Sequence, residues 1–505
     1  MPLAPQAAYD ELLRRVREVA LLGSCGGVLG WDRETYMPPK GAAHRAEQAA
    51  LLAGLCHEKF TDPKVGELIA ATEGTDVVAD PLSAAAVNVR ELRRAYDRAT
   101  KLPRDLVEEL ARVTTLAHGE WAKARKASDF ARFRPWLEKI VALKIREADC
   151  YGHSGDRFDA LLEDYEPGAT AAWLTGVFGP LRDELVPLLD AIRGSSRRPD
   201  PSILQRHYPT GLQETFGRLA ASAIGFDFQA GRLDTTVHPF CAGIGPGDTR
   251  LTTRYNERDF ADAFFSIVHE AGHGLYDQSL PAEHWGTPRG DSVSLGIHES
   301  QSRLWENLVA RSLPFWRHFF PIARQFFPAA LADVGLDAFH FAINEVKPSF
   351  IRVDADEVTY NLHIILRFEL ERALLSGDLA VADLPAAWNE KFQHYLGLTP
   401  PDDAQGCLQD IHWSGGGIGY FPTYTLGNLC AAQLFESARR AIPDLDGQMA
   451  QGAFGDLLGW LRQSIHQRGM QLRAPQLIQA VTGQPLAHRA LIAHLRTKFE
   501  PLYGL

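Results

Sequence analysis

Several features that often define a class of protein are missing from this chain of 505 residues. The six cysteines are scattered and include no Cys-x-x-Cys pair, which argues against a disulfide framework and favours a reducing compartment. No apolar run is long enough to span a bilayer. The formal net charge is −11, with no basic block, so the sequence favours neither nucleic-acid nor membrane-surface binding. We therefore expect a cytoplasmic protein with no nucleic-acid or membrane partner.

The chain also lacks linker-like stretches, internal repeats and low-complexity tracts. Its composition, 45% hydrophobic and 23% charged, is ordinary for a globular protein, so we expect one large domain over residues 1–505. Acidic residues interrupt the basic and apolar beginning of the chain. For this reason residues 8–22 are better interpreted as an amphipathic helix than as an export signal.

Helical periodicity is the dominant pattern that is present. Apolar residues recur at steps of three and four, which predicts a mainly helical, all-α fold. The predicted helices cover residues 8–22, 42–56, 83–100, 104–127, 133–150, 169–193, 211–223, 258–278, 293–312, 314–333, 358–376, 427–441, 453–468 and 487–500. Loops are predicted at 31–39 and 164–168. The clearest strand runs over 248–255, where its edge could pair with an extended peptide; a surface turn is the alternative.

The stretch His269-Glu270-Ala271-Gly272-His273 contains the pattern His-Glu-x-x-His. Residues four apart share one face of a helix, so both imidazoles can point at a single metal ion while Glu270 lies beside it. Asn256 and Asp259 are candidate caps for this helix. The alternative is a pair of buried histidines with a surface glutamate, which would be an unusual combination in a core helix. The motif predicts a zinc peptidase site.

A catalytic zinc site usually has three protein ligands, so one more is needed. The extended pattern with a third histidine is excluded because Ser279 occupies that position. Glu283, Glu299 and Glu306 are the downstream carboxylates. We choose Glu299, which falls in a predicted helix beginning after residue 291 or 292, and Glu306 could support it from two turns later. An exposed ion pair between Glu299 and Arg303 is the alternative.

Several further motifs make the chain similar to the thermostable carboxypeptidase Taq family of metallocarboxypeptidases, peptidase family M32. The resemblance covers essentially the whole chain. The motifs are His238-Pro239-Phe240, Asp248-Thr-Arg250-Leu-Thr252, His269-Glu-Ala-Gly-His273, His298-Glu299-Ser300-Gln301, Ile351-Arg352-Val-Asp-Ala355-Asp356 and Gly406-Cys-Leu-Gln409-Asp410-Ile-His412-Trp413. The resemblance implies a two-lobed helical peptidase with a deep substrate groove and a small β element beside the active-site helix. It also implies a homodimer.

For the metal, the resemblance implies a zinc ion, one per subunit, held by His269, His273 and Glu299, with cobalt as a possible substitute. Glu270 then acts as the general base that takes a proton from the attacking water. The oxyanion that develops at the carbonyl carbon needs further donors. His412 is the best source, and similar helical zinc peptidases favour Tyr424 over Tyr420 as its companion; both tyrosines could instead be core aromatics.

An exopeptidase must also recognise a free carboxylate, which the guanidinium fork of arginine binds well. Arg352 is our first choice and Arg250 the second. Either could instead be paired with a neighbouring acid, such as Asp354, Asp356 or Asp248. The resemblance adds His238 as a third candidate for substrate binding.

The sequence thus predicts a zinc-dependent metallocarboxypeptidase that removes single residues from peptides with a free C-terminus. Two other functions remain open at this point. An oligoendopeptidase of the related helical zinc group would share the catalytic residues and bind substrate ends differently. A non-catalytic peptide-binding protein would use zinc as a structural ion, although an intact Glu270 argues against it.

Overall fold

A computed structural model describes residues 3–153 and 155–505. The chain forms two compact units. The first unit comprises Met1–Thr100, Asp200–Ile343 and Leu434–Gly483, and the second comprises Lys101–Pro199, Asn344–Gln433 and Gln484–Leu505. Each unit is thus assembled from three separate segments, and cutting the chain at any single point would leave at least one of them incomplete.

Helices dominate both units, as the periodicity predicts: about 70% of the chain is helical and the only sheet in the described ranges has three strands. In the first unit the α-helices are α1 (Pro5–Thr35), α2 (Ala42–Phe60), α3 (Pro63–Thr72), α4 (Ala84–Lys101), α9 (Thr210–Ala223), α10 (Phe260–Asp277), α11 (Leu295–Arg303), α12 (Leu313–Phe326), α13 (Pro328–Leu331), α14 (Leu336–Ile343), α18 (Leu445–Ala450), α19 (Gly455–Ser464) and α20 (Ala474–Thr482). None of the helices in residues 3–153 and 155–505 is both long and apolar enough to cross a membrane.

The helix α10 is the centre of the first unit. Asp259 caps it, because its carboxylate accepts hydrogen bonds from the backbone N–H groups of Ala261 and Asp262. Its apolar positions are buried, as the spacing predicts, and it packs against α9, α11 and the sheet. At Gly272 a Cβ atom would lie 2.6 Å from the Cα atom of Ser302, so this glycine allows α10 and α11 to approach closely.

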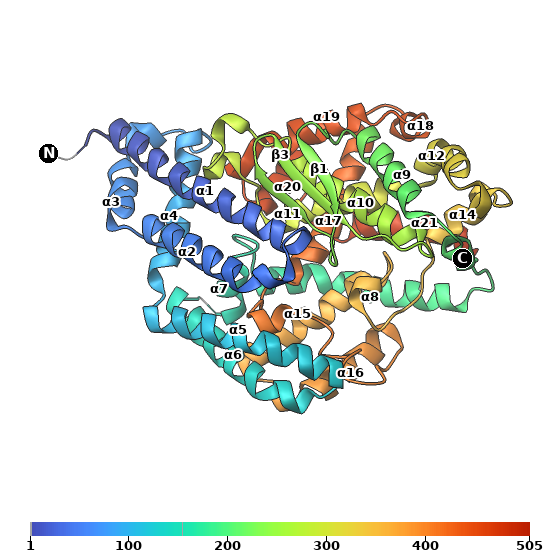
Figure 1. The fold of residues 1–505 in the computed structure, drawn as a ribbon, viewed down its shortest axis with the longest axis horizontal. Coiled ribbons are helices and arrows are strands. Elements are labelled where there is room, and N and C mark those ends of the chain that lie inside the picture. Colours follow the sequence, from blue (N-terminus) through green and yellow to red (C-terminus); the bar gives the residue numbers. More distant parts are fainter. Residues whose placement is uncertain (1–2, 154) are drawn as a thin grey trace. The chain divides into compact units, whose positions relative to one another are not determined.

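The small sheet has the order β1-β3-β2, with strands β1 (Gly231–Thr235), β2 (Cys241–Gly245) and β3 (Asp248–Thr253). The predicted strand exists, beside α10 (Figure 1), and ends two residues early. It is the central strand, parallel to β1 and antiparallel to β2. The expectation that its edge could bind a peptide is therefore wrong, because both edges already form backbone hydrogen bonds.

The helix α1 also differs from the prediction. It continues past residue 22 to Thr35, so the first five residues of the predicted loop at 31–39 are helical. The glycines in this stretch weaken a helix without stopping it, and the first proline after it is Pro38. Trp31 is buried near the end of α1, and this burial helps to hold the last turns in place. Figure 1 shows α1 and α2 as an antiparallel pair at the N-terminal end of the chain.

The second unit is also helical. Its helices are α5 (Arg104–Ala127), α6 (Phe130–Tyr151), α7 (Arg157–Leu162), α8 (Ala171–Gly194), α15 (Tyr360–Ser376), α16 (Leu384–Leu396), the first part of α17 (Pro422–Ala441) and α21 (Arg489–Tyr503). The prediction for α5 matches at both ends, and α5 lies against α6 (Figure 1). The short helices α3, α7, α14, α16, α18 and α20 were not predicted, since short apolar patterns carry a weak signal.

Candidate active site

His269 and His273 lie on one face of α10 and both turn their Nε2 atoms toward Glu299. The distances to Oε2 of Glu299 are 3.7 Å from His269 and 3.4 Å from His273. The three ligand atoms all lie within 4.8 Å of one another, and no other group of this kind occurs in residues 3–153 and 155–505. Nitrogen and carboxylate ligands at about 2.1 Å from a tetrahedral zinc ion would themselves lie ~3.4 Å apart. The donor set therefore fits a zinc ion in both chemistry and spacing.

Glu299 reaches this position from α11, which begins at Leu295 and is capped by Ser294. The helix therefore starts a few residues later than predicted. The ion pair with Arg303 also forms: Nε of Arg303 donates to Oε1 of Glu299 at 2.7 Å. One carboxylate oxygen of Glu299 therefore faces Arg303, and the other faces the two histidines. The pair is buried, not exposed as the alternative would have it.

The other side of His269 is held by Glu306, whose Oε2 lies 2.9 Å from Nδ1 of His269. Glu306 belongs to a π-helical segment, Leu304–Ala310 (η6), that follows α11 directly. A π-helical turn contains an extra residue, and such turns often occur at functional sites. Arg303 and Arg311 also contact Glu306. A carboxylate on Nδ1 leaves Nε2 of His269 free for a metal ion.

Glu270 is buried beside these groups. Burial, with the nearby carboxylates of Glu299 and Glu306, raises the pKa of Glu270 to about 7, although His269 acts in the opposite direction. A general base works best with a pKa near the working pH. The buried position of Glu270 and its raised pKa therefore suit the role of general base that the sequence predicts.

The charges around the two histidines favour a cation. Burial lowers the pKa of His273 to about 4, so the ring is neutral at pH 7, as a metal ligand must be. Burial also acts to lower the pKa of His269, but Glu299 and Glu306 outweigh it and raise that pKa. Burial opposes ionisation of Glu299, yet Arg303 and the two histidines hold its pKa well below the usual value. The Glu299 carboxylate is therefore ionised.

Arg352 is buried in the second unit, in a short 3₁₀ turn (Arg352–Asp354, η7). Its Nε donates to Oδ1 of Asp410 at 3.0 Å, and its Nη1 donates to the hydroxyl of Tyr360 at 3.0 Å. Nε of Arg367, which is fully buried on α15, donates to the other oxygen of Asp410 at 2.7 Å. Arg352 is thus paired with Asp410, whereas Asp356 accepts hydrogen bonds from the backbone N–H groups of Val358 and Thr359. Two guanidinium groups share this one carboxylate.

His412, Tyr420 and Tyr424 gather in the same unit. The ring centroid of His412 lies 5.2 Å from that of Tyr420 and 6.3 Å from that of Tyr424. The Arg352 guanidinium lies 5.0 Å from the Tyr424 ring. Burial lowers the pKa of His412 to about 4, with Asp410 opposing and Arg352 assisting this shift. The imidazole is therefore neutral at pH 7 and can donate one N–H group.

Glu371 ties down the loop that carries His412. One carboxylate oxygen accepts from Nε1 of Trp413 at 2.8 Å, and the other accepts from the backbone N–H of Gly419 at 3.0 Å. Gly419 has φ +91°, which favours glycine, and its Cβ position is 3.1 Å from the backbone nitrogen of Leu162. The glycine-rich run from 415 to 419 is therefore fixed at both ends.

Comparison with known proteins agrees with these motifs. Residues 11–499 match the profile of a family described as carboxypeptidase Taq (M32) metallopeptidase. The chain belongs to this family. It is 50% identical to thermostable carboxypeptidase 1 of Thermus thermophilus, over 99% of this chain and 100% of that protein. It is 38% identical to carboxypeptidase 1 of Bacillus subtilis, over 98% of each chain. The M32 carboxypeptidase structure from Deinococcus radiodurans R1 superimposes with a TM-score of 0.96, at 41% identity, over 99% of this chain and 100% of that one.

Membership of the M32 family confirms the resemblance, the helical fold and the assignment as a peptide hydrolase. It also implies a metal cofactor. The two alternatives from the sequence lose support, because the matching relatives are named carboxypeptidases.

Arg250 and His238 are the other two residues predicted to bind substrate. Arg250, on β3, forms a two-pronged ion pair with Asp248 at 2.8 and 2.7 Å and lies 4.3 Å above the ring of Trp31. Its guanidinium is therefore already paired with an acid, as the alternative for Arg250 predicts. His238 is exposed in the bend between β1 and β2.

Sequence reasoning missed Asp410 as the partner of Arg352, and it missed Arg367 as the second guanidinium group on the same carboxylate. Asp410 lies within the M32 motif around His412, but the sequence alone assigns it no role. Arg367 is flanked by Ile365, Leu366 and Phe368 on α15, and a charge in such an apolar stretch is a signal for a buried ion pair. The acid that each would meet lies more than forty residues away in the chain, which no local pattern reveals.

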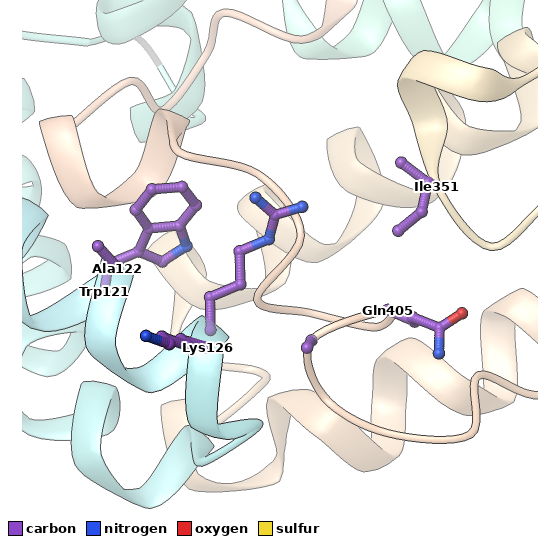
Figure 2. Close-up of a pocket in the computed structure, with 7 residues that line it drawn as sticks. Trp121, Ala122, Lys126, Ile351 and Gln405 are labelled. Atoms are coloured by element: carbon purple, nitrogen blue, oxygen red, sulfur yellow. The ribbon is translucent and has the colours of Figure 1, made fainter.

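The second unit also contains a surface pocket of about 390 Å³ between α5 and the segment around Gln405 (Figure 2). It is lined by Trp121, Ala122, Arg125, Lys126, Ile351, Ala404 and Gln405. The Trp121 indole is not free for a ligand, because its N–H donates to the carbonyl of Leu408 at 2.9 Å. None of the predicted catalytic residues lines this pocket, so we do not place the catalytic site there.

Proposed function

We propose that this chain is a zinc-dependent carboxypeptidase that hydrolyses the last peptide bond of a peptide and releases single amino acids. The observation that carries the proposal is the convergence of His269, His273 and Glu299 next to the buried carboxylate of Glu270. Membership of the M32 family supplies the carboxypeptidase class. We propose zinc as the metal because two imidazoles and one carboxylate are a usual catalytic zinc ligand set.

His269, His273 and Glu299 would hold the ion. A zinc ion bound there supplies Lewis acidity, which makes a water molecule more acidic and polarises the scissile carbonyl. Glu270 takes the proton of the attacking water and passes it to the nitrogen of the leaving amino acid. Its burial supports this role, because a carboxylate with a pKa near 7 can both accept and return a proton.

Arg352 is the proposed anchor for the C-terminal carboxylate of the substrate. Arg352 and Arg367 are buried and share Asp410, so these three side chains carry one more positive charge than negative. A further carboxylate would balance that charge. We prefer Arg352 to Arg250 because Nε and Nη2 of Arg250 are both already engaged by Asp248, and we give His238 no role in catalysis.

His412 and Tyr424 are the proposed donors to the oxyanion, with Tyr420 as the alternative tyrosine. The neutral imidazole of His412 has one N–H to offer, and its Nδ1 has no hydrogen-bond partner among the described residues. A buried polar atom without a partner is costly unless a ligand satisfies it. Glu371 would keep the loop of His412 in place during the reaction.

Metal analysis combined with a peptide-hydrolysis assay tests this function. We expect the purified protein to contain about one zinc per chain, to lose hydrolysis on chelation, and to recover it when zinc or cobalt is returned. Activity that persists after complete metal removal would contradict the proposal. The homodimer stays a prediction, which the mass of the protein in solution can test.

A further inference from the structure

His298 connects the proposed metal ligand His273 to a carboxylate. Nδ1 of His298 lies 2.6 Å from Nδ1 of His273, and Nε2 of His298 lies 3.0 Å from Oδ1 of Asp277. His273 and Asp277 are four residues apart on α10, and His298 faces them from α11, next to Glu299. The three side chains form one chain of hydrogen bonds that ends at the metal ligand.

The positions of the protons follow from these contacts. His273 turns Nε2 toward Glu299, so Nε2 is its metal-binding atom and its Nδ1 carries the hydrogen. Of two ring nitrogens 2.6 Å apart only one can donate, so Nδ1 of His298 accepts. The hydrogen of His298 is then on Nε2 and is donated to Asp277. With Nε2 of His273 kept for the metal ion, this is the one arrangement of neutral rings in which two acceptors do not face each other.

The surrounding residues hold this chain in place. The Tyr276 ring lies 5.2 Å from the His298 ring, and the Tyr276 hydroxyl accepts from the backbone N–H of Val293 at 3.2 Å. Strand β2 approaches Asp277 so closely that a Cβ atom on Gly243 would lie 2.6 Å from Oδ2 of Asp277. The pairing of β2 with β3 is irregular at Gly243, which brings the backbone up to the carboxylate.

We propose that Asp277 and His298 act as a carboxylate–imidazole relay that orients His273 and strengthens its bond to the metal ion. Carboxylates that accept the second N–H of a histidine ligand make the ligand a better donor and fix its ring. Glu306 has this position directly on His269. On His273 the carboxylate of Asp277 would have the same function, but it acts through the imidazole of His298, which lies between them. The proposal rests on the assignment of His269, His273 and Glu299 as metal ligands.

Zinc affinity, measured by competition with a chromophoric chelator, tests the relay. His298→Phe removes both hydrogen bonds and keeps an aromatic ring beside Tyr276; we expect zinc to bind about 10- to 100-fold more weakly. Asp277→Asn keeps an acceptor for His298 but removes the charge, so a smaller loss is expected. Asp291→Asn is the control, because Asp291 is a nearby, solvent-exposed acid whose carboxylate accepts a hydrogen bond from the backbone N–H of Ser292.

The absorption spectrum of the cobalt-loaded protein provides a second readout, since it reports the ligand field directly. We expect Asp277→Asn to shift this spectrum and Asp291→Asn to leave it unchanged. Unchanged zinc affinity in both Asp277→Asn and His298→Phe would overturn the relay, as would an equal loss in Asp291→Asn. If His298→Phe fails to fold, Asp277→Asn decides alone. If the unaltered protein binds no zinc, the proposed function fails, which is a distinct outcome.

Discussion

The candidate metal site of the first unit and the arginine cluster of the second unit both bury charged groups, but of different kinds. Around the two histidines, Glu299 and Glu306 are paired with Arg303 and Arg311, and Glu270, whose pKa burial raises to about 7, is only partly ionised at pH 7. In the second unit two guanidinium groups share Asp410. The buried carboxylate of Glu371 does not change this balance at pH 7, because burial raises its pKa to about 8.

This difference indicates what each region can bind. A buried excess of charge is costly unless a partner of the opposite sign offsets it. The imidazole and carboxylate ligand atoms of the first region suit a divalent cation, and the positive surplus of the second region suits the carboxylate at the end of a peptide. A carboxypeptidase needs both, whereas an endopeptidase has no use for the second.

The largest expected effect concerns the acidic side. Glu270→Gln keeps the shape of the side chain and removes the base, so kcat should fall about 10³- to 10⁴-fold while bound zinc stays at one per chain. Steady-state kinetics and metal analysis measure both quantities. Glu283→Gln, an exposed carboxylate close by in the sequence, is the control and should change neither. A Glu270→Gln protein with near-normal kcat would remove Glu270 as the base.

On the basic side, the next largest effect should come from His412. His412→Phe removes the N–H donor but keeps an aromatic ring beside Phe421, which lies 4.5 Å away between ring centroids. Loss of one oxyanion donor should lower kcat about 10²-fold and leave KM nearly unchanged. A large rise in KM with normal kcat would instead place His412 in substrate binding.

Arg352 provides the sharpest contrast between the two regions. Arg352→Lys keeps the buried charge but loses the fork, and KM for free-acid peptides should rise about 10- to 100-fold. Peptides with an amidated C-terminus should show little change, because they have no carboxylate to bind. Arg250→Lys is the control, and it should affect both kinds of peptide equally. Equal effects of Arg352→Lys on the two kinds would contradict the proposed role.

The smallest expected effect concerns a histidine that the first unit keeps uncharged. Burial lowers the pKa of His466 from 6.5 to about 3, so protonation favours the unfolded chain and stability falls as the pH drops below 6.5. Near pH 5 this should cost about 2 kcal/mol. In His466→Gln the loss of stability between pH 7 and pH 5 should be smaller by that amount, as measured by urea unfolding. The same dependence on pH in His466→Gln as in the unaltered chain would contradict this.

His44→Gln is the control for this measurement, since His44 is exposed on α2. It should show the same dependence on pH as the unaltered chain.

The two regions also differ in how well the sequence predicts them. His269 and His273 are four residues apart on one helix, so their spacing alone indicates a shared face, and Glu299 follows from the next helix. The partner of Arg352 is Asp410, which the fold brings close from a distant part of the chain. Charge pairing over such separations depends on tertiary packing and leaves no periodic pattern. Only the family motifs indicated that these residues belong together.

The secondary structure also divides into elements that the local sequence predicts and elements that depend on contacts with distant segments. The cap at Asp259 and the apolar spacing of α10 are local, and the predicted helix agrees within two residues at its start. The length of α1 and the central place of β3 depend on contacts with distant segments. Trp31 is held under Arg250 at 4.3 Å, and β3 pairs with strands on both sides. Tertiary contacts therefore decided the elements that the sequence missed.

Identification of the hydrolysis products tests the central claim most directly. An unbiased mixture of peptides is incubated with the zinc-loaded protein and followed by mass spectrometry, with the chelated protein and the Glu270→Gln variant as blanks. The account predicts free single amino acids and ladders of peptides shortened one residue at a time from the C-terminus. Internal fragments, or products that also form in the blanks, would contradict it.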